Sequence, residues 1–233
     1  MSTAVLISGH ARTFRHTFAN QYWMVLRHYS DVTIFASVVQ DEDASALDLL
    51  TTRFPAARVH IETVLQPTLP EPPGHPEFHA PAAIKGSVQG ILRQLWHLNR
   101  VRTFAGSLEN FHTVIRLRPD LWFHRFQRPR LELDNLSCVT PWWGSYGGIN
   151  DRFAVMGDEA ADAYFSTIEH IAPMIAQGCP LHPESLLSRQ LELYDVHLSR
   201  TLQTEFSTLR ANGALEWPQI EHYDTVNCLR NSR

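Results

Sequence analysis

Cysteine is scarce in this sequence. Only Cys138, Cys179 and Cys228 occur among 233 residues, and they are odd in number and far apart. This count excludes a disulfide framework, and no Cys-x-x-Cys pair suggests a zinc knuckle. Because widely spaced single cysteines are typical of a reducing compartment, we expect a cytoplasmic protein.

The sequence also lacks long apolar runs and an excess of basic charge. No segment approaches the ~20 apolar residues that a membrane-spanning helix needs, and no basic region precedes an apolar core at the N-terminus. We therefore expect no transmembrane segment and no secretion. The 24 acidic residues outnumber the 20 basic ones, for a formal net charge of -4. This balance argues against a nucleic-acid partner, whose phosphates require a basic surface.

What remains is the composition of an ordinary soluble domain, with 44% apolar and 19% charged residues. The length suits one large domain, and no internal repeat is visible. We predict a single domain over residues 1–233 with a proline-rich loop at 66–81. The prolines of this loop are Pro67, Pro70, Pro72, Pro73, Pro76 and Pro81. Such a density excludes a packed element and favours a partly ordered lid beside the site, with a polyproline spacer as the alternative.

Strand and helix patterns alternate along the first half of the chain. Apolar runs at 4–8, 31–39 and 58–64 predict strands, and helical spacing at 14–29 and 44–53 predicts the helices between them. This order indicates an α/β fold with a mainly parallel central sheet flanked by helices. Further helices are expected from Ile84 to about Phe104, over 158–176 and from Pro183 onward.

The stretch from Phe111 to Phe123 is the centre of the chain. Its apolar run should form a buried strand that stops at Pro119, which cannot donate to a strand ladder. Asp120 then lies at the carboxyl edge of that strand, where ligands bind in open α/β sheets. The alternative is an Asp that caps a turn after a proline.

A second candidate site follows the first strand, at Gly9 and Arg12. A glycine after a buried strand lets the backbone approach a ligand, and amides at the next helix start can receive an anion. Arg12 adds a bidentate donor, so this loop would suit a diphosphate. The alternative is a glycine that only makes a turn.

The long helix that starts near Ile84 carries a polar stripe next to its apolar one. Lys85, Gln89 and Arg93 lie at its near end beside the proline-rich loop and are candidate ligand contacts. His97 and Arg100 continue the stripe, and we expect a solvated face there.

Aromatic residues and glycines crowd the segment 141–148, just before Asn150-Asp151-Arg152. Aromatic faces among polar donors suit a sugar ring, although core packing would explain one of the tryptophans. The Asp151 carboxylate, which follows this cluster, is a candidate catalytic group. Glu184 is another, although Pro183-Glu184 is also an ordinary helix start.

Four short motifs in order resemble a group of glycosyltransferase-like proteins. They are Ser8-Gly9-His10-Ala11-Arg12-Thr13-Phe14, Ile115-Arg116-Leu117-Arg118-Pro119-Asp120, Gly148-Ile149-Asn150-Asp151-Arg152-Phe153-Ala154 and His182-Pro183-Glu184. The resemblance covers residues 3 to about 200. It implies a GT-A-type, Rossmann-related fold, a nucleotide-sugar donor and a glycan or glycoconjugate acceptor.

The resemblance also implies a divalent cation, Mn²⁺ or Mg²⁺, held by an Asp-x-Asp motif. Here Arg118-Pro119-Asp120 keeps only the last carboxylate. Either Asp120 alone bridges the metal to the diphosphate, with a late histidine such as His222 completing the shell, or Arg118 supplies the positive charge instead.

The leading hypothesis is therefore a glycosyltransferase in which Asp120 and Arg12 hold the diphosphate. In an inverting enzyme Asp151, placed ahead of Glu184, would deprotonate the acceptor hydroxyl; a retaining enzyme would need no such base. The alternative function is a non-catalytic nucleotide- or sugar-binding protein on the same fold. A hydrolase is disfavoured because the Gly-x-Ser-x-Gly nucleophile elbow is missing.

Overall fold

The computed structural model describes residues 1–41, 43–54, 57–74, 87–129, 133–201 and 203–216. Its strands are β1 (Thr3–Gly9), β2 (Val32–Val39), β3 (Arg58–Val64), β4 (Thr113–Leu117), β5 (Leu121–Phe126), β6 (Ser137–Pro141), β7 (Phe153–Met156), β8 (His197–Thr201), β9 (Thr204–Leu209) and β10 (Leu215–Glu216). Its α-helices are α1 (Phe14–Met24), α2 (Asp48–Arg53), α3 (Val88–Ala105), α4 (Asp158–Phe165), α5 (Ile171–Ala176) and α6 (Pro183–Leu193). Short 3₁₀ helices cover Leu26–His28, Ala44–Leu47 and Thr167–His170.

The larger of two sheets has seven strands in the order β3-β2-β1-β4-β7-β6-β8. The first four pair in parallel, β7 runs antiparallel to both β4 and β6, and β8 is parallel to β6. One strand of the seven is thus reversed. The predicted α/β class with a mainly parallel sheet is confirmed.

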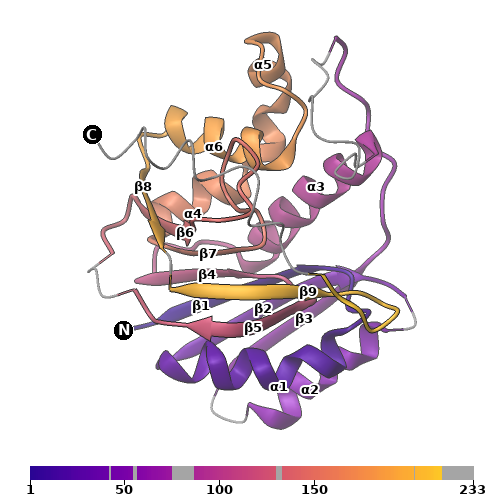
Figure 1. The fold of residues 1–233 in the computed structure, drawn as a ribbon, viewed down its shortest axis with the longest axis vertical. Helices are drawn as coiled ribbons and strands as arrows, with labels where there is room; N and C mark the ends of the chain where they lie inside the picture. Colours follow the sequence, from indigo (N-terminus) through magenta and orange to yellow (C-terminus); the bar gives the residue numbers. More distant parts are fainter. Residues whose placement is uncertain (42, 55–56, 75–86, 130–132, 202, 217–233) are drawn as a thin grey trace.

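The central strands are apolar on both faces because helices cover both faces. Ala4 and Leu6 of β1 pack into the core beneath α3, α4 and α6, whereas Val5 and Ile7 pack into the core beneath α1 and α2. Figure 1 shows these two helical layers on opposite sides of the sheet. Continuous burial of this kind is expected of parallel strands rather than an alternating pattern.

A second sheet extends the chain's central stretch. β5 pairs antiparallel with β9, and β10 adds to the other edge of β9. Phe123 of β5 and Phe206 of β9 pack edge to face with ring centroids 5.3 Å apart, and both belong to the core on the α1 side. The sequence after Asp120 therefore leaves the main sheet at once and joins the three-stranded one.

The helix predicted over 158–176 is divided into α4, a 3₁₀ turn and α5. Pro173 explains the break, because a continuous helix would lose its N–H bond and clash with the carbonyl four residues earlier. The Ser166 and Thr167 hydroxyls also bond back to the carbonyls of Ala163 and Tyr164, which competes with the helix ladder. The helix predicted over 14–29 likewise ends early, at Met24.

Among the described residues, none of the helices has the length and apolar character needed to cross a bilayer.

Candidate active site

A pocket of about 440 Å³ lies where the carboxyl ends of β1 and β4 meet the start of α1 and one side of α3. Its lining is mostly polar and strongly cationic. The described residues that line it are Ser8, Gly9, His10, Arg12, Thr13, Gln66, Gly90, Arg93, Gln94, His97, Arg116, Arg118, Pro119, Asp120, Leu209, Arg210 and Ala211. Five arginines thus face one carboxylate. An electrostatic lining of this kind favours an anionic ligand.

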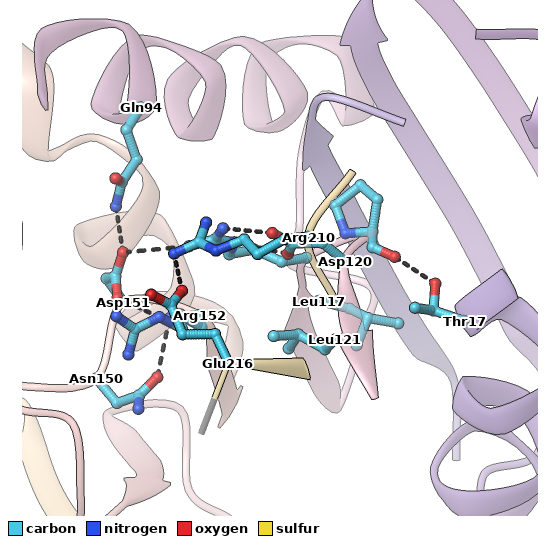
Figure 2. A network of polar contacts seen from close by, with 12 residues as sticks. Thr17, Gln94, Leu117, Asp120, Leu121, Asn150, Asp151, Arg152, Arg210 and Glu216 are labelled. Carbon is cyan, nitrogen blue, oxygen red and sulfur yellow. Dashed lines mark hydrogen bonds and ion pairs between the residues drawn. The ribbon is translucent and has the colours of Figure 1, made fainter. Parts of the chain in front are cut away.

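Side chains of α1 hold the turn that carries Arg118 and Asp120. Gln21, which is fully buried, donates from Nε2 to the carbonyls of Arg118, Pro119 and Leu121 at 3.0–3.1 Å. The Thr17 hydroxyl donates to the Pro119 carbonyl at 2.5 Å, as Figure 2 shows. The carbonyls of this turn are thereby satisfied, and the turn is fixed at the pocket.

Arg118 and Asp120 form a bidentate ion pair across this turn. Arg118 Nε and Nη2 donate to the two carboxylate oxygens of Asp120 at 3.0 and 2.6 Å. Burial alone would lower the pKa of Arg118, but Asp120 and Asp151 outweigh it and raise that pKa above its ordinary value. The carboxylate of Asp120 therefore serves a guanidinium, whereas the turn-cap alternative would have it accept from a backbone amide.

Arg116 of β4 lies below this pair and is 2% exposed. Its Nη1 donates to the Ser8 hydroxyl at 2.9 Å and to the Leu117 carbonyl at 3.3 Å. Burial lowers the pKa of Arg116 to about 10, which still leaves it charged at neutral pH. The pocket floor therefore carries a permanent positive charge.

His97 of α3 is 4% exposed and faces the same floor, so the predicted solvated face is wrong at His97, although the Arg100 side chain is 40% exposed. Burial, together with His10 and Arg116, lowers the pKa of His97 to about 4. The helix turns this stripe toward the sheet edge rather than toward water. Arg100, one turn further on, forms a 2.5 Å ion pair with Glu62 of β3.

Several of the predicted donor contacts meet at this pocket. Gly9, at a φ of 114° where glycine is favoured, ends β1 at the pocket, and Arg12 is exposed at its rim. Arg93 lines the pocket and donates to the Pro67 carbonyl at 3.0 Å. Gln89 does not line it: its amide bonds the backbone of Leu69 at 3.2 and 2.8 Å.

These bonds from α3 tie the first part of the proline-rich loop to the helix. Gln66 reaches the pocket lining, so the loop begins beside the site as expected of a lid. Lys85, the other predicted contact of α3, lies outside the described residues, as do residues 75–81 of the loop.

Asp151 lies directly behind the pocket wall, with its side chain 4% exposed. Gln94 donates to its Oδ2, while Arg118 Nη1 lies 4.0 Å and Arg152 Nε 3.8 Å from its carboxylate oxygens. Figure 2 shows Gln94 and Arg152 meeting Asp151. Burial alone would raise the pKa of Asp151, but Arg152, Arg118 and Arg116 outweigh it and hold that pKa below its ordinary value.

Glu184, in the first turn of α6, is brought next to the Asp151 loop. The Ile149 amide donates to the Glu184 carbonyl at 3.1 Å, and Gly148 packs so tightly there that a Cβ would lie 2.0 Å from that carbonyl oxygen. The Glu184 carboxylate is buried, 3.0 Å from Nε2 of His182. Burial and the neighbouring Asp151 raise the pKa of Glu184. Neither Asp151 nor Glu184 is among the residues that line the pocket.

The aromatic cluster does not stack over this pocket. Trp143 is buried in the core, with its ring 4.5 Å from that of Phe206 and its Nε1 donating to the Thr204 carbonyl at 2.9 Å. No residue of 142–148 is in the described lining. Trp143 is therefore the tryptophan that core packing explains, and the sugar-stacking surface predicted from this cluster is not at the pocket.

The described residues do not fit the divalent cation that the resemblance implied. Both oxygens of Asp120 already accept from Arg118, and His10 is bonded to Asp41 at 3.1 Å. Within the described parts of the chain, no group of three or more His, Cys, Asp or Glu side chains could hold a metal ion. A cation in this lining would also be repelled by the arginines. His222 lies outside the described residues.

Comparison with known families gives one match over nearly the whole chain. The family model described as "Domain of unknown function (DUF7796)" matches residues 1–226. The chain belongs to this family. No curated protein sequence matches the DUF7796 chain.

Solved structures show what fold this DUF7796 chain has. The apo form of the glycosyltransferase GlyE of Streptococcus pneumoniae TIGR4 is 11% identical with a TM-score of 0.50, over 86% of this chain and 45% of GlyE. Mouse xyloside xylosyltransferase 1 in its apo form is 9% identical with a TM-score of 0.48, over 86% of this chain and 84% of that one. The DUF7796 chain thus spans under half of the GlyE chain. The GlyE likeness, together with the sheet, shows a glycosyltransferase-like GT-A-type fold.

Sequence reasoning missed several residues of the DUF7796 pocket, among them Thr13, Gln94, Arg116 and His97. The sequence does contain a signal for Arg116, because this charged residue interrupts the apolar run from Val114 to Leu117. An arginine in a buried strand is rare and indicates a structural or functional partner. The sequence contains no such signal for Gln94 and His97. Helical spacing alone does not show which polar residues of α3 face the edge of the sheet.

Proposed function

We propose that the protein is a glycosyltransferase that moves a sugar from a nucleoside-diphosphate donor to a hydroxyl group of a glycan or glycoconjugate. The observation that carries the proposal is the arginine-rich pocket at the carboxyl ends of β1 and β4. A donor of this class presents a diphosphate, and guanidiniums match its oxygens in bidentate geometry. The GT-A-type fold supports the same ligand class by analogy.

In the proposed reaction the acceptor oxygen attacks the anomeric carbon of the donor sugar. The bond between that carbon and the phosphate oxygen breaks, and the diphosphate leaves with the electron pair. Arg12 at the rim and the buried arginines of the pocket stabilise the charge that develops on the leaving group. Gly9 keeps the backbone clear of the phosphates.

The two carboxylates behind the pocket take different roles in this proposal. Asp151 is kept ionised and weakly basic by three arginines, so it suits the positioning of Arg118 and Gln94. Glu184 has a raised pKa and is the better proton acceptor for the acceptor hydroxyl in an inverting reaction. The electrostatics thus favour Glu184 over Asp151, the reverse of the order expected from the sequence.

The test is a panel of nucleoside-diphosphate sugars, assayed for thermal stabilisation and for release of the nucleoside diphosphate. We expect one donor class to stabilise the chain and to be turned over. Glu184→Gln should lower turnover by roughly 10²–10⁴-fold with donor affinity unchanged. The matched Asp151→Asn change should lower turnover much less, because Arg118 keeps its bidentate pair with Asp120. Binding of a donor without turnover would favour the non-catalytic alternative, and stabilisation by none would overturn both.

We also propose a cytoplasmic location. Both described cysteines, Cys138 and Cys179, are unpaired thiols, as a reducing compartment would keep them.

A further inference from the structure

Three of the five arginines in the pocket are already engaged by the protein. Arg118 is paired with Asp120, and Arg93 donates to a backbone carbonyl. Arg210, just after β9, forms an ion pair with Glu216 of β10, as Figure 2 shows. Carboxylates match the charges of Arg118 and Arg210 before any ligand binds, and Arg93, which is only partly buried, is hydrogen-bonded to the loop.

Arg116 differs from these three. It is almost fully buried, its Nε has no hydrogen-bond partner, and none of the described carboxylates lies within ion-pair distance of it. Its polar contacts are the neutral oxygens of Ser8 and Leu117. Asp120 and Asp151 act on it only from beyond ion-pair distance. Because burying a charge without a close partner costs several kcal/mol, a guanidinium in this state points to a partner that the described residues do not supply.

Two other residues of the lining also have buried polar atoms without a hydrogen-bond partner among the described residues. Both ring nitrogens of His97 and the hydroxyl oxygen of Thr13 are buried without a hydrogen-bond partner among the described residues. Buried polar groups are nearly always bonded in native proteins. Unpartnered atoms of Arg116, His97 and Thr13 around a single pocket indicate one ligand with several acceptor oxygens.

We propose that Arg116, His97 and Thr13 form the floor of a phosphate-binding subsite that takes the diphosphate directly, without a divalent cation. The inference rests on the proposed function for the identity of the donor, but the ligand class follows from the lining. The Arg116 guanidinium supplies the positive charge, while the neutral imidazole of His97 and the Thr13 hydroxyl donate one hydrogen bond each. Asp120 then has the separate task of holding Arg118.

The experiment is calorimetric titration of the full chain with inorganic pyrophosphate in buffer containing EDTA. Arg116→Met keeps an unbranched side chain in the buried position and removes the charge. The control is Arg125→Met, an arginine of β5 whose side chain is 61% exposed outside the pocket. We expect wild type and the control to bind equally, and Arg116→Met to bind at least roughly 30-fold more weakly.

Thermal melting without ligand separates this role from a structural one. Removing an unmatched buried charge should leave the melting temperature of Arg116→Met equal or higher, since function rather than stability keeps the charge there. A lower melting temperature with unchanged pyrophosphate affinity would overturn the assignment of Arg116.

Thr13→Val covers the case in which Arg116→Met does not fold. It removes one unpartnered hydroxyl with almost no change of shape, and we expect roughly fivefold weaker pyrophosphate binding. Affinity equal to wild type would overturn the subsite. Binding that appears only when Mn²⁺ or Mg²⁺ replaces EDTA would overturn the cation-free claim.

Failure of this inference and failure of the proposed function give different results. Pyrophosphate binding in EDTA without transfer from any donor would overturn the function and leave the subsite standing. Sugar transfer that requires Mn²⁺ would overturn the cation-free subsite and leave the proposed function standing.

Discussion

At the scale of single residues, two arginines that lie two positions apart in the sequence have different electrostatic environments in the pocket. Arg118 carries a raised pKa because carboxylates surround it, whereas burial lowers the pKa of Arg116. The Arg-Pro-Asp motif draws attention to the first, but its charge is already matched by Asp120. The charge of Arg116 on β4, which no carboxylate pairs, is available to a ligand, as is that of Arg12 at the rim.

The Asp120→Asn variant tests what this carboxylate does. We expect turnover to fall by about 10²-fold because Arg118 loses its bidentate partner and shifts. Pyrophosphate affinity measured in EDTA should be retained or rise, since the pocket gains net positive charge. A loss of affinity that depends on added Mn²⁺ would instead identify Asp120 as a metal ligand.

His97 should make stability depend on pH in a defined window. Its pKa falls from an ordinary 6.5 to about 4 on folding, so the unfolded chain binds more protons between these values. Stability therefore rises with pH through that window and is lost as pH falls, by up to roughly 3 kcal/mol. When the free energy of unfolding is measured with urea at pH values from 7 to 4, its slope against pH should be shallower for His97→Gln than for wild type. His112→Gln, at an exposed position, is the control, and equal slopes for all three would contradict the prediction.

At the scale of elements, helix α1 contributes more to the geometry of the site than the loop that precedes it. The helix begins just after Arg12, but its side chains also reach the turn between β4 and β5. Asn20 of α1 exchanges two hydrogen bonds with the backbone of Phe123, which pins the start of β5. One helix thus connects the main sheet, the pocket and the smaller sheet.

Gln21→Met tests this connection. The substitution keeps the side-chain size and removes the Gln21 donor from the carbonyls of Arg118 and Leu121, while the Pro119 carbonyl keeps Thr17. The free energy of unfolding should therefore fall by about 1–3 kcal/mol. Turnover should fall as well, because Arg118 and Asp120 sit on the released turn. Gln40→Met, at an exposed position after β2, should change neither. A stable Gln21→Met protein with normal turnover would show that the turn holds its own shape.

At the scale of the whole molecule, the two cores share the strands of one sheet. Alternate residues of β1 and β4 point into the core under α3 or the core under α1. Losing either helical layer would expose apolar strand residues that the other layer cannot cover. We infer that both layers unfold together, in keeping with the single domain expected over residues 1–233.

Calorimetry tests that inference. We expect one thermal transition whose van't Hoff and calorimetric enthalpies agree, with an enthalpy of about 0.7 kcal/mol per residue near 60 °C. Tryptophan fluorescence and far-UV circular dichroism should report the same urea midpoint. Two resolved transitions would mean that the layers are separate cooperative units.

The first four strands and the class of the fold could be predicted from the sequence. Apolar runs bounded by Gly9 and Pro119 marked β1 and β4, and the alternation of strands and helices predicted the mainly parallel sheet, because these signals are local. It also marked Gly9, Arg12, Arg93, Arg118 and Asp120, which do meet at one pocket. Strand ends of a parallel sheet lie at one edge, so residues after the strands converge there.

Which charges are matched depends on contacts that form only in the folded protein. Whether Asp120 serves a metal or Arg118, whether His97 meets water or the pocket, and whether Trp143 stacks on a ligand or fills the core all depend on contacts between distant segments. Sequence spacing carries no information on such contacts, since a polar stripe or an aromatic cluster has the same periodicity in either setting. The unmatched charge of Arg116 became visible only when β1, β4 and α3 were placed together, because burial and pairing are properties of the assembled fold.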